Sequence, residues 1–335
     1  MDISSLKKAL LNPEIYPDHP KDIKWVETHI SIVFLTGNYA YKIKKPVNFG
    51  FLDFTSLERR KFFCEQEVTL NRRLARNLYL GVFPITEEKG RISVDGKGRI
   101  IEYAVKMEQI PDELLMNNLV QQNRVTPKMV EAIAEKLVDF YSSAKTSGYI
   151  ESFARPERLK QDTDENFVQT EKFMDATIPK NVYEHVKERT DKFFKERGGL
   201  FSRRIASHRI RDCHGDLRLE HIFWGKEVFI IDCIEFNERF RYTDVAGDIA
   251  FLAMDIDYHG KPELNEPLIR TYIEKSGDED LLEILDFYKC YRAYVRGKVD
   301  SLQLDDPNIP EEKKREALHR ARKYFGLAYQ YSRRF

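Results

Sequence analysis

The sequence predicts an α+β protein in which a small antiparallel sheet with one main helix precedes a larger, mostly helical part. Short apolar or alternating segments, typical of strands, lie at 30–44 and 79–107. An amphipathic segment at 56–75, typical of a helix, separates them. From about Asp112 onward the apolar periodicity is almost wholly helical.

Residues 1–24 are expected to form an N-terminal arm. They begin with a short amphipathic segment, and Pro13, Pro17 and Pro20 then prevent a helix from continuing. We expect this arm to lie on the sheet-containing part. That part is placed at 25–110 and the helical part at 111–335.

The composition is that of a globular protein large enough for two lobes, with 335 residues of which 33% are charged. Lys+Arg and Asp+Glu both number 55, so the net charge speaks against nucleic acid as a partner. No apolar run approaches the roughly 20 residues of a membrane span, and no basic-then-apolar leader pattern occurs. The four cysteines are scattered, as reduced thiols are. We expect a cytoplasmic monomer or homodimer without a membrane segment.

Two strands are predicted around a tight Gly-Asn turn. Apolar residues alternate over 30–35, and the returning strand is 39–44. Because side chains alternate across a strand, Lys42 and Lys44 lie on the same face as Ala40. A lysine in a strand usually belongs to a solvated face, so a role in a site needs support from elsewhere.

A helix is predicted from a cap at Ser56 to about Ala75. Glu67 falls within its apolar stripe, where an unpaired carboxylate is costly. A lysine from the adjacent strand would offset that cost, whereas Glu65 points towards solvent. The stripe consists of Phe63, Glu67, Leu70 and Leu74.

Two further strands, 79–85 and 99–107, are predicted around a polar, glycine-containing turn at 89–98. The second strand ends abruptly at 108–111, where Pro111 removes a backbone donor. An ordinary edge strand explains this ending nearly as well as a functional segment does.

The helical part contains a basic cluster directly before its main motif. The cluster is either solvated surface, or part of it approaches phosphates or pairs with carboxylates of a site. Its members are Arg203, Arg204, Arg209 and Arg211. The helices expected in this part are 127–144, 167–174, 182–201, 286–302 and 311–331.

A pair of aspartates surrounds a short strand within the helical part. His214-Gly215-Asp216 precedes a polar loop, and the apolar run 228–231 leads to Asp232. The run is β-branched and too short for a helix, so Asp232 emerges at the end of a buried strand. Phosphoryl transfer uses two such acids, one to accept the proton of an attacking hydroxyl and one to hold Mg²⁺. The alternative is a hairpin with surface acids.

Together with Asp248-Ile249-Ala250, these motifs resemble those of the aminoglycoside phosphotransferase and choline kinase-like family, the small-molecule branch of the protein-kinase fold. The resemblance covers most of the chain and is strongest at 26–80 and 209–257. It implies a bilobal protein-kinase-like fold and an ATP-dependent kinase acting on a hydroxyl of a small molecule. The wider stretch looks like an uncharacterised bacterial subgroup. In the family, the residue matching Asp248 holds the catalytic loop.

The resemblance implies roles for the residues around the two aspartates. Asp216 would accept the proton of the acceptor hydroxyl, His214 would brace the loop by hydrogen bonding, and Asp232 would hold Mg²⁺ against the ATP phosphates. His221 stands where the family carries an Asn metal ligand. Because Mg²⁺ prefers oxygen ligands, we expect either a single Mg²⁺ or some use of Mn²⁺.

The resemblance also implies a nucleotide site in the sheet-containing part. Lys42 ends an Ala-x-Lys motif that matches the lysine reaching the α- and β-phosphates, and Glu67 would hold it. Lys44 is the rival to Lys42, and Glu65 is the rival to Glu67. The hinge that would pair with adenine comprises Met107, Glu108 and Gln109.

The acceptor pocket is expected in the helical part, where the resemblance is weakest. Arg292 and Arg296 share a face of the predicted helix 286–302, with tyrosines interleaved. They form either a solvated, partly snorkelling face or a reader of an anionic acceptor such as a sugar phosphate or a nucleotide. Arg218 and Glu235 are further candidates for acceptor contacts.

Two other functions remain open. His221 favours a kinase-fold protein without catalysis that binds a nucleotide or a partner as a regulatory module. A kinase acting on a protein or RNA hydroxyl would use the Tyr/Arg helix as a binding surface, although the neutral charge speaks against RNA. A Walker-type ATPase is excluded, because no Gly-x-x-x-x-Gly-Lys-Ser/Thr segment occurs.

Overall fold

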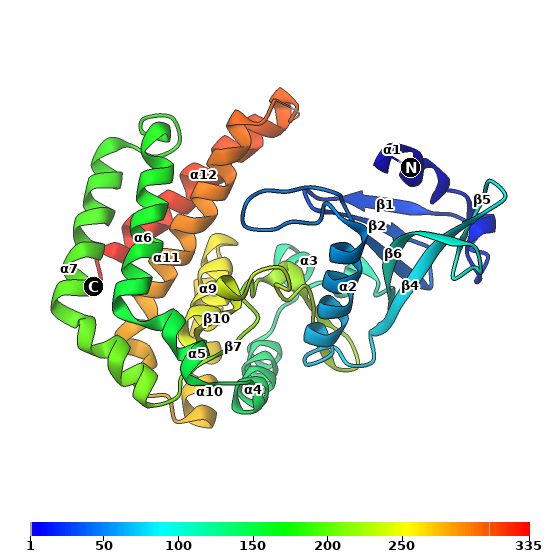
Figure 1. Ribbon diagram of the computed structural model, residues 1–335. Coiled ribbons are helices and arrows are strands. Elements are labelled where there is room, and N and C mark those ends of the chain that lie inside the picture. Colours follow the sequence, from blue (N-terminus) through cyan, green and yellow to red (C-terminus); the bar gives the residue numbers. More distant parts are fainter. Residues whose placement is uncertain (1, 308) are drawn as a thin grey trace. The chain divides into compact units, whose positions relative to one another are not determined.

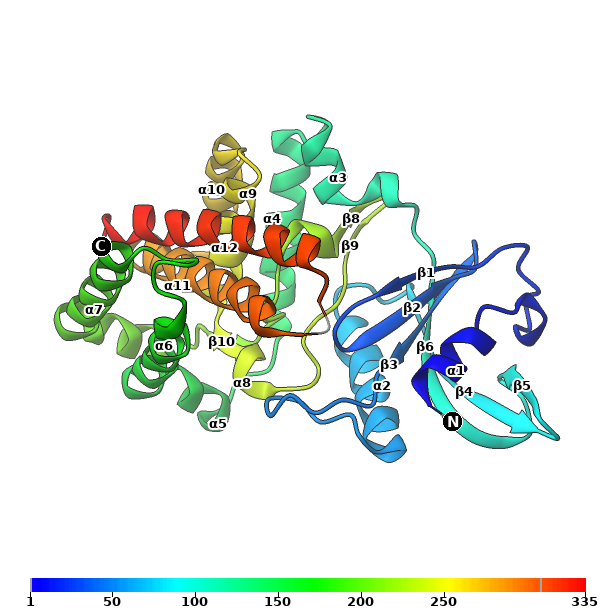
Figure 2. The ribbon, with the colours of Figure 1, turned by 90° about the horizontal axis from the view of Figure 1, so that it is seen from above.

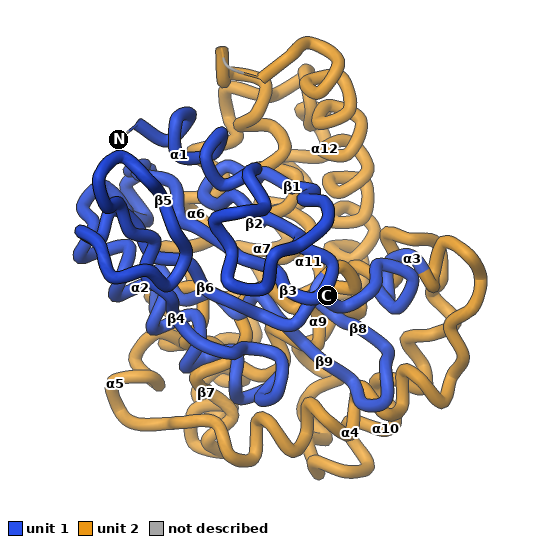
Figure 3. Tube along the Cα trace, turned by 90° about the vertical axis from the view of Figure 1, so that its right-hand side faces the viewer, with its two compact units in different colours: residues 1–118, 221–238 blue, residues 119–220, 239–335 orange. Residues whose placement is uncertain are grey.

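The computed structural model describes residues 2–307 and 309–335 (Figure 1), and its chain divides into two compact units (Figure 3). Unit 1 contains the described residues up to Asn118 together with 221–238. Unit 2 contains 119–220 and 239–335. The division falls later than residue 110, and it assigns a segment from the second half of the chain to the unit that holds the sheet.

Unit 1 is built on a six-stranded antiparallel sheet of order β1-β2-β3-β6-β4-β5. Two of its strands, β1 and β5, lie at the edges and were not predicted. Both are four-residue segments of mostly exposed or half-buried side chains, so pairing with a neighbour rather than apolar pattern determines them. The strands are β1 Lys24–Glu27, β2 Ser31–Leu35, β3 Tyr39–Lys44, β4 Tyr79–Glu88, β5 Arg91–Val94 and β6 Arg99–Glu108.

One face of this sheet is covered by the N-terminal arm. Tyr41 and Ile43 of β3 share a buried cluster with Leu6 and Leu10, which lie in and directly after α1 (Ile3–Ala9). The arm therefore lies on the sheet, as its amphipathic start predicted.

Helix α2 (Leu57–Asn71) covers the other face, where Ala40 packs with Cys64 and Val68. Ser56 caps α2 by accepting a hydrogen bond from the Arg59 N–H at 3.2 Å. Because β3 alternates, the residues that follow Ala40 at intervals of two point towards α2. Two lysines are thereby directed at a helix that carries a buried glutamate.

The remaining elements of unit 1 include a two-stranded hairpin, β8 (Ile222–Trp224) and β9 (Val228–Ile230). This hairpin contains the short apolar strand expected before Asp232. The connection to the helical unit carries a 3-10 turn at Asp112–Leu114 and helix α3 (Met116–Gln121).

Unit 2 is almost wholly helical, and Figure 2 shows its long helices side by side. Four predicted helices are confirmed as α4, α7, α11 and α12. A small antiparallel pair, β7 (Ile210–Asp212) and β10 (Tyr242–Asp244), completes the unit. The helices are α4 Pro127–Ser143, α5 Gly148–Glu151, α6 Pro156–Thr170, α7 Lys180–Ala206, α8 Glu238–Arg241, α9 Val245–Tyr258, α10 Asn265–Ser276, α11 Leu281–Leu302 and α12 Glu311–Ser332.

The helix predicted at 167–174 was wrong in its bounds, since α6 begins at Pro156 and ends at Thr170. The first turns of α6 bury polar side chains in place of apolar ones, so they lack the apolar period. Asp162 pairs with Arg239 at 2.7 Å, and the Asn166 Oδ1 accepts a hydrogen bond from Lys298 at 2.6 Å.

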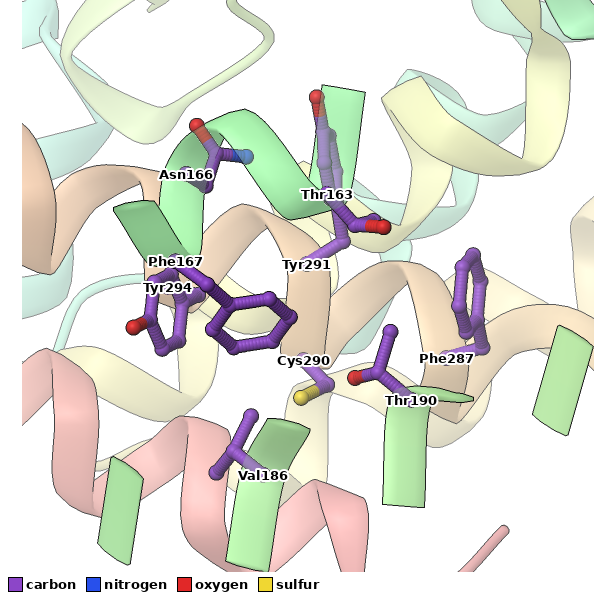
Figure 4. A pocket seen from close by; sticks show the side chains of 9 residues that line it. All are labelled: Thr163, Asn166, Phe167, Val186, Thr190, Phe287, Cys290, Tyr291 and Tyr294. Carbon is purple, nitrogen blue, oxygen red and sulfur yellow. The ribbon is translucent and has the colours of Figure 1, made fainter. Parts of the chain in front are cut away.

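The core of unit 2 forms around α9, α11 and α12. Helix α9 is buried along nearly its whole length, which explains its unusually apolar sequence. Gly297 of α11 allows α12 to come close, because a Cβ there would lie 2.8 Å from the ring of Phe325. Between α6, α7 and α11 there remains a cavity of only about 10 Å³, room for roughly one water (Figure 4). These three helices are therefore closely packed against one another at this point.

The arginines of the basic cluster before His214 make different kinds of contact. Arg204 is buried, donating to Asp244 at 2.6 and 2.9 Å and also pairing with Asp278. Arg209 and Arg211 donate to backbone carbonyls of Ser276 and Ala144, at the ends of α10 and α4. These three arginines thus hold helix ends together. Along the described chain, no helix is both long and apolar enough to cross a membrane.

We predict that Arg204→Met destabilises the protein by roughly 3–5 kcal/mol, because it leaves Asp244 and Asp278 buried without their cation. Arg203→Met removes an exposed neighbour that pairs with Glu283 and should cost less than about 1 kcal/mol. Urea unfolding of both variants measures the difference. Similar losses in the two variants would contradict the assignment.

Candidate active site

Two lysines and a glutamate form a buried charged cluster in unit 1. Glu67 of α2 lies 2.8 Å from Lys42 Nζ through Oε1 and 2.8 Å from Lys44 Nζ through Oε2. Lys42 also contacts Asp232 Oδ1 at 2.6 Å, and Lys44 contacts Glu235. Five charges therefore alternate in sign from Asp232 to Glu235.

The charges of this cluster shift one another's pKa values. Burial alone would lower the pKa of Lys42, but Asp232, Glu67 and Glu235 raise it well above its usual value. Burial would raise the pKa of Glu67, but the two lysines bring it below its usual value. For Glu235 burial dominates, and its pKa is raised.

The contacts distinguish the two candidate lysines. The Lys44 side chain is 1% exposed and closed between two glutamates. The Lys42 side chain is 13% exposed and reaches Asp232, whose side chain is 44% exposed. Of the two, Lys42 is available to a ligand, although its nucleotide role remains a prediction. Glu65, the rival to Glu67, is exposed.

Glu235 was expected as a candidate acceptor contact, and that expectation was wrong. Its side chain is 5% exposed and is buried against Lys44. A second buried acid is required there because Glu67 alone would leave two buried lysines with one carboxylate between them.

Asp232 follows β9 and has a left-handed backbone, with φ of +63°. Such a conformation is strained for a non-glycine residue and is found disproportionately at functional sites. His221 Nε2 lies 3.6 Å from Asp232 Oδ2, so the two predicted metal ligands are neighbours. Within residues 2–307 and 309–335, however, no three His, Cys, Asp or Glu side chains converge on one point.

The polypeptide after Asp232 is anchored by a residue that the sequence analysis missed. The side-chain Oδ1 of Asn71 accepts a hydrogen bond from the Cys233 N–H at 2.9 Å. Asn71 is fully buried one turn after Glu67 on the same face of α2. A second polar residue in that apolar stripe was the available signal.

Backbone N–H groups of the predicted hinge are already hydrogen bonded within unit 1. The Glu108 N–H donates to Leu78 O at 2.9 Å, and the Gln109 N–H donates to Asn38 O at 2.9 Å. Met107 is a buried partner in the pairing of β3 with β6. The backbone donors of Glu108 and Gln109 are therefore not available to adenine, which corrects that part of the hinge assignment.

In unit 2, the loop with the His-Gly-Asp motif is held by a buried carboxylate. Asp248, in the first turn of α9, accepts hydrogen bonds from the His214 N–H at 2.7 Å and the Gly215 N–H at 3.0 Å. Tyr141 of α4 donates to the same carboxylate at 3.2 Å. The predicted structural role of Asp248 is confirmed by these bonds, whereas Tyr141 was not foreseen.

His214 is fully buried within this loop, and its Nδ1 accepts the Asp216 N–H at 3.3 Å. Gly215 has a φ of +90°, which a residue with a side chain rarely adopts. The turn between the two therefore requires glycine. Asp216 leaves the turn with its side chain 25% exposed.

Arg218 holds both oxygens of the Asp216 carboxylate, at 2.9 Å and 2.8 Å. It also pairs with Glu220. Burial would lower the pKa of the Arg218 guanidinium, but Asp216, Glu220 and Asp255 raise it well above its usual value. The proposed base thus carries a permanent cation beside it.

Arg292 was expected on a solvated or acceptor-reading face of its helix, and the structure corrects that placement. It is buried, and it donates to Gly215 O and Gly247 O at 3.2 Å each. Its guanidinium lies 4.8 Å from the ring centre of Phe251. Because α9 covers this face of α11, Arg292 supports the loop from the carbonyl side. Arg296, one turn further along α11, is half-buried.

The two units therefore each provide a partly exposed carboxylate on a buried support. Unit 1 offers Asp232 beside a lysine and an imidazole. Unit 2 offers Asp216 beside an arginine, on a loop that is hydrogen bonded through its backbone. Anionic oxygens can be bound by the first set, and a hydroxyl proton can be accepted by the second.

We predict that Lys44→Met destabilises the protein by roughly 3–5 kcal/mol near pH 8, because Glu67 and Glu235 are left with Lys42 alone. An unneutralised buried carboxylate has a raised pKa, so the folded variant binds more protons than the unfolded chain. The loss relative to wild type should therefore shrink as the pH falls towards 5. Urea unfolding across this pH range provides the measurement.

The matched control for Lys44 is Lys45→Met, which removes the next lysine along the chain. Lys45 pairs with Glu27 at the surface and should contribute less than about 1 kcal/mol at any pH. If the loss of stability in Lys44→Met does not change with pH, removing Lys44 leaves no buried carboxylate without a cation, and the explanation is refuted.

Comparisons with known proteins place this geometry in context. No family model matches the chain. It is 33% identical over 278 residues to uncharacterized proteins of Mycobacterium tuberculosis and Mycobacterium bovis, covering 83% of this chain and 54% of each of those proteins. The chain thus spans about half the length of the curated relatives it matches.

Among solved structures, a choline/ethanolamine kinase family protein from Mesorhizobium loti is 13% identical to this chain. The TM-score is 0.53, and the superposition covers 99% of both chains. The predicted bilobal, protein-kinase-like α+β fold is confirmed, and the chain shares this fold with that protein.

Proposed function

We propose that this protein is an ATP-dependent phosphotransferase that moves the γ-phosphate to a hydroxyl of a small molecule. The observation that carries the proposal is the buried Lys42–Glu67 pair beside the exposed carboxylate of Asp232. A lysine held by a helix glutamate, next to a carboxylate at a strand end, is the arrangement that binds nucleotide phosphates in this fold.

In the proposal, unit 1 binds the nucleotide. Lys42 leaves Asp232 for the α- and β-phosphates while Glu67 continues to hold it. Lys44 and Glu235 keep Glu67 in place during that exchange, since their contacts do not involve Asp232. With the Glu108 and Gln109 N–H groups occupied, adenine recognition uses other groups of the segment after β6.

Asp232 and His221 are the proposed protein ligands of a divalent cation. A partly exposed carboxylate with an imidazole 3.6 Å away fits a cation that takes its other ligands from phosphate oxygens and water. Such a cation supplies neutralisation of charge on the phosphates. The imidazole favours Mn²⁺ relative to an oxygen-only site.

Asp216 is the proposed base for the acceptor hydroxyl. Each carboxylate oxygen has a second lone pair, so Asp216 can accept the hydroxyl while it keeps both bonds to Arg218. The backbone bonds to Asp248 limit movement of the loop, so the hydroxyl is oriented rather than merely attracted. No covalent intermediate on the protein is required.

Three features support a small-molecule acceptor in a reducing compartment. The fold is shared with a choline/ethanolamine kinase family protein, the net charge is zero, and the four cysteines are buried and unbridged. Reduced buried thiols are typical of cytoplasmic proteins, which is the localisation we propose.

We predict that Asp216→Asn and Asp232→Asn each lower ATP-to-ADP turnover by about 10³-fold or more. Asp216→Asn should retain nucleotide affinity, because Asp216 does not contact the phosphates in the proposal. Asp232→Asn should lose the part of that affinity that depends on the divalent cation. Coupled-enzyme assays and titration with a fluorescent ATP analogue measure the two quantities.

A half-buried acid far along the sequence from both motifs provides the control for these variants. Asp286→Asn, on the surface of α11, should keep wild-type turnover. If the wild type and both site variants convert ATP equally, the proposed roles are refuted. If the wild type binds ATP without converting it under any condition, a regulatory nucleotide-binding module is the better description.

We further predict that His221→Asn shifts the metal preference towards Mg²⁺, because an amide oxygen replaces the imidazole nitrogen. The ratio of turnover with Mn²⁺ to turnover with Mg²⁺ should fall by at least about threefold. Turnover at matched concentrations of the two metals gives this ratio. An unchanged ratio would remove His221 from the metal site.

A further inference from the structure

Arg296 of α11 is a half-buried arginine whose charge is not matched. Its Nε atom is buried and makes no hydrogen bond. Within residues 2–307 and 309–335, Arg296 makes no hydrogen bond or ion pair at all. A buried donor atom without a hydrogen-bond partner is unusual and calls for an explanation.

The other arginines in the interior of unit 2 all have anionic or carbonyl partners. Arg241 pairs with Asp212 at 2.5 Å, and Arg320 pairs with Asp300 at 2.9 Å. Arg204, Arg218 and Arg292 were described above with their partners. Arg296 differs from these because, among the described residues, its guanidinium is paired only with an aromatic ring. Its centre lies 5.7 Å from the centre of the Tyr324 ring.

The position of Arg296 relates it to the loop with Asp216. Arg292 donates to Gly215 O in that loop, and Arg296 lies one turn further along the same face of α11. Burial raises the pKa of Tyr324, and Arg296 and Arg218 both counteract it. Both cations therefore act electrostatically on the same buried tyrosine.

The ring under Arg296 belongs to an ordered aromatic pair. Tyr324 stacks on Tyr258 of α9 with ring centres 4.2 Å apart and planes inclined by 16°. Lys323 lies 4.1 Å above the Tyr258 ring. The pair forms a rigid wall that carries a cation at each ring.

The acidic groups in this region are already engaged. Asp255 accepts the Leu219 N–H at 2.9 Å and lies 3.9 Å from His259. Asp300 is held by Arg320. No carboxylate among the described residues is paired with Arg296, so its charge is available to an anion from outside the chain.

We propose that Arg296 binds an anionic group, a phosphate or a carboxylate, of the molecule whose hydroxyl is phosphorylated. This inference rests on the proposed function and specifies its acceptor. A guanidinium presents paired donors that match these groups, and burial strengthens the interaction. The half-buried ring of Tyr258, which Tyr324 supports from behind, packs against the apolar part of the acceptor. The same charge disfavours polycationic acceptors such as aminoglycosides.

The test compares acceptors that differ only by an anionic group. Ribose and ribose 5-phosphate, glucose and glucose 6-phosphate, and glucose and glucuronate are assayed with ATP. The wild type should prefer the anionic member of a pair by at least tenfold in kcat/KM. Arg296→Gln should reduce that preference at least tenfold by raising the KM of the anionic acceptor. Arg296→Lys keeps the positive charge and should retain part of the preference.

Arg320→Gln is the matched control, because it removes a neighbouring charge that Asp300 already neutralises. It should keep the preference for anionic acceptors. Thermal unfolding of each variant shows whether the fold is intact. Equal use of neutral and anionic acceptors by the wild type, or an equal loss of both in Arg296→Gln, would overturn the proposal.

A binding measurement keeps the proposal testable if none of these acceptors is phosphorylated. Inorganic phosphate is titrated in the presence of ADP by isothermal calorimetry. Binding should weaken at least tenfold in Arg296→Gln and little in Arg320→Gln; equal binding in wild type and Arg296→Gln would refute the anion site. A failure of the proposed phosphotransferase is recognised by a separate measurement, the binding of ATP. If that proposal is wrong, ATP binding will not depend on Asp232.

Discussion

The interaction on which the rest of this structure depends is the neutralisation of Glu67, a carboxylate buried in the apolar face of α2. Burying such a charge is unfavourable unless cations accompany it. The spacing of Lys42 and Lys44 by two residues directs both towards α2, because side chains alternate along β3. Two cations then exceed one acid, and Glu235 provides the second. The chain after β9 is thereby tied to the sheet.

The loop in unit 2 is stabilised by a different use of charge. Asp248 accepts backbone N–H groups from it, and Arg292 donates to its carbonyl at Gly215. The backbone of the loop is thus hydrogen bonded through both its N–H groups and a carbonyl, while the Asp216 side chain is held separately by Arg218. In both units a fully buried acid supports a partly exposed one, Glu67 with Asp232 and Asp248 with Asp216. Rigid supports of this kind reduce the reorganisation that catalysis requires.

Arginine is the residue type whose role varies most across this protein. Arg204 neutralises two buried aspartates and fixes the start of α9. Arg218 neutralises the proposed base, and Arg292 binds carbonyls. Arg296 has none of these partners. A planar, permanently charged group with several donors can serve each environment, so its partners rather than its position in a motif indicate its role.

The sequence by itself determined the fold class, the elements with strong periodicity and the two aspartates of the proposed site. Local signals sufficed for these: alternation in β2 and β3, the cap at Ser56, and an acid at the end of a short strand. It also indicated Glu67, because one carboxylate in an apolar stripe must find a cation.

Only the tertiary structure decided which of the two lysines is inaccessible to a ligand and that Glu235 is buried. It also decided that Arg292 supports a loop, whereas Arg296 lacks an anionic partner. The edge strands β1 and β5 and the polar start of α6 were likewise beyond the reach of periodicity. The physical reason is common to all of these. A charged side chain in a strand or helix has the same local pattern whether water, a carboxylate or a carbonyl lies opposite. That neighbour comes from a distant part of the chain.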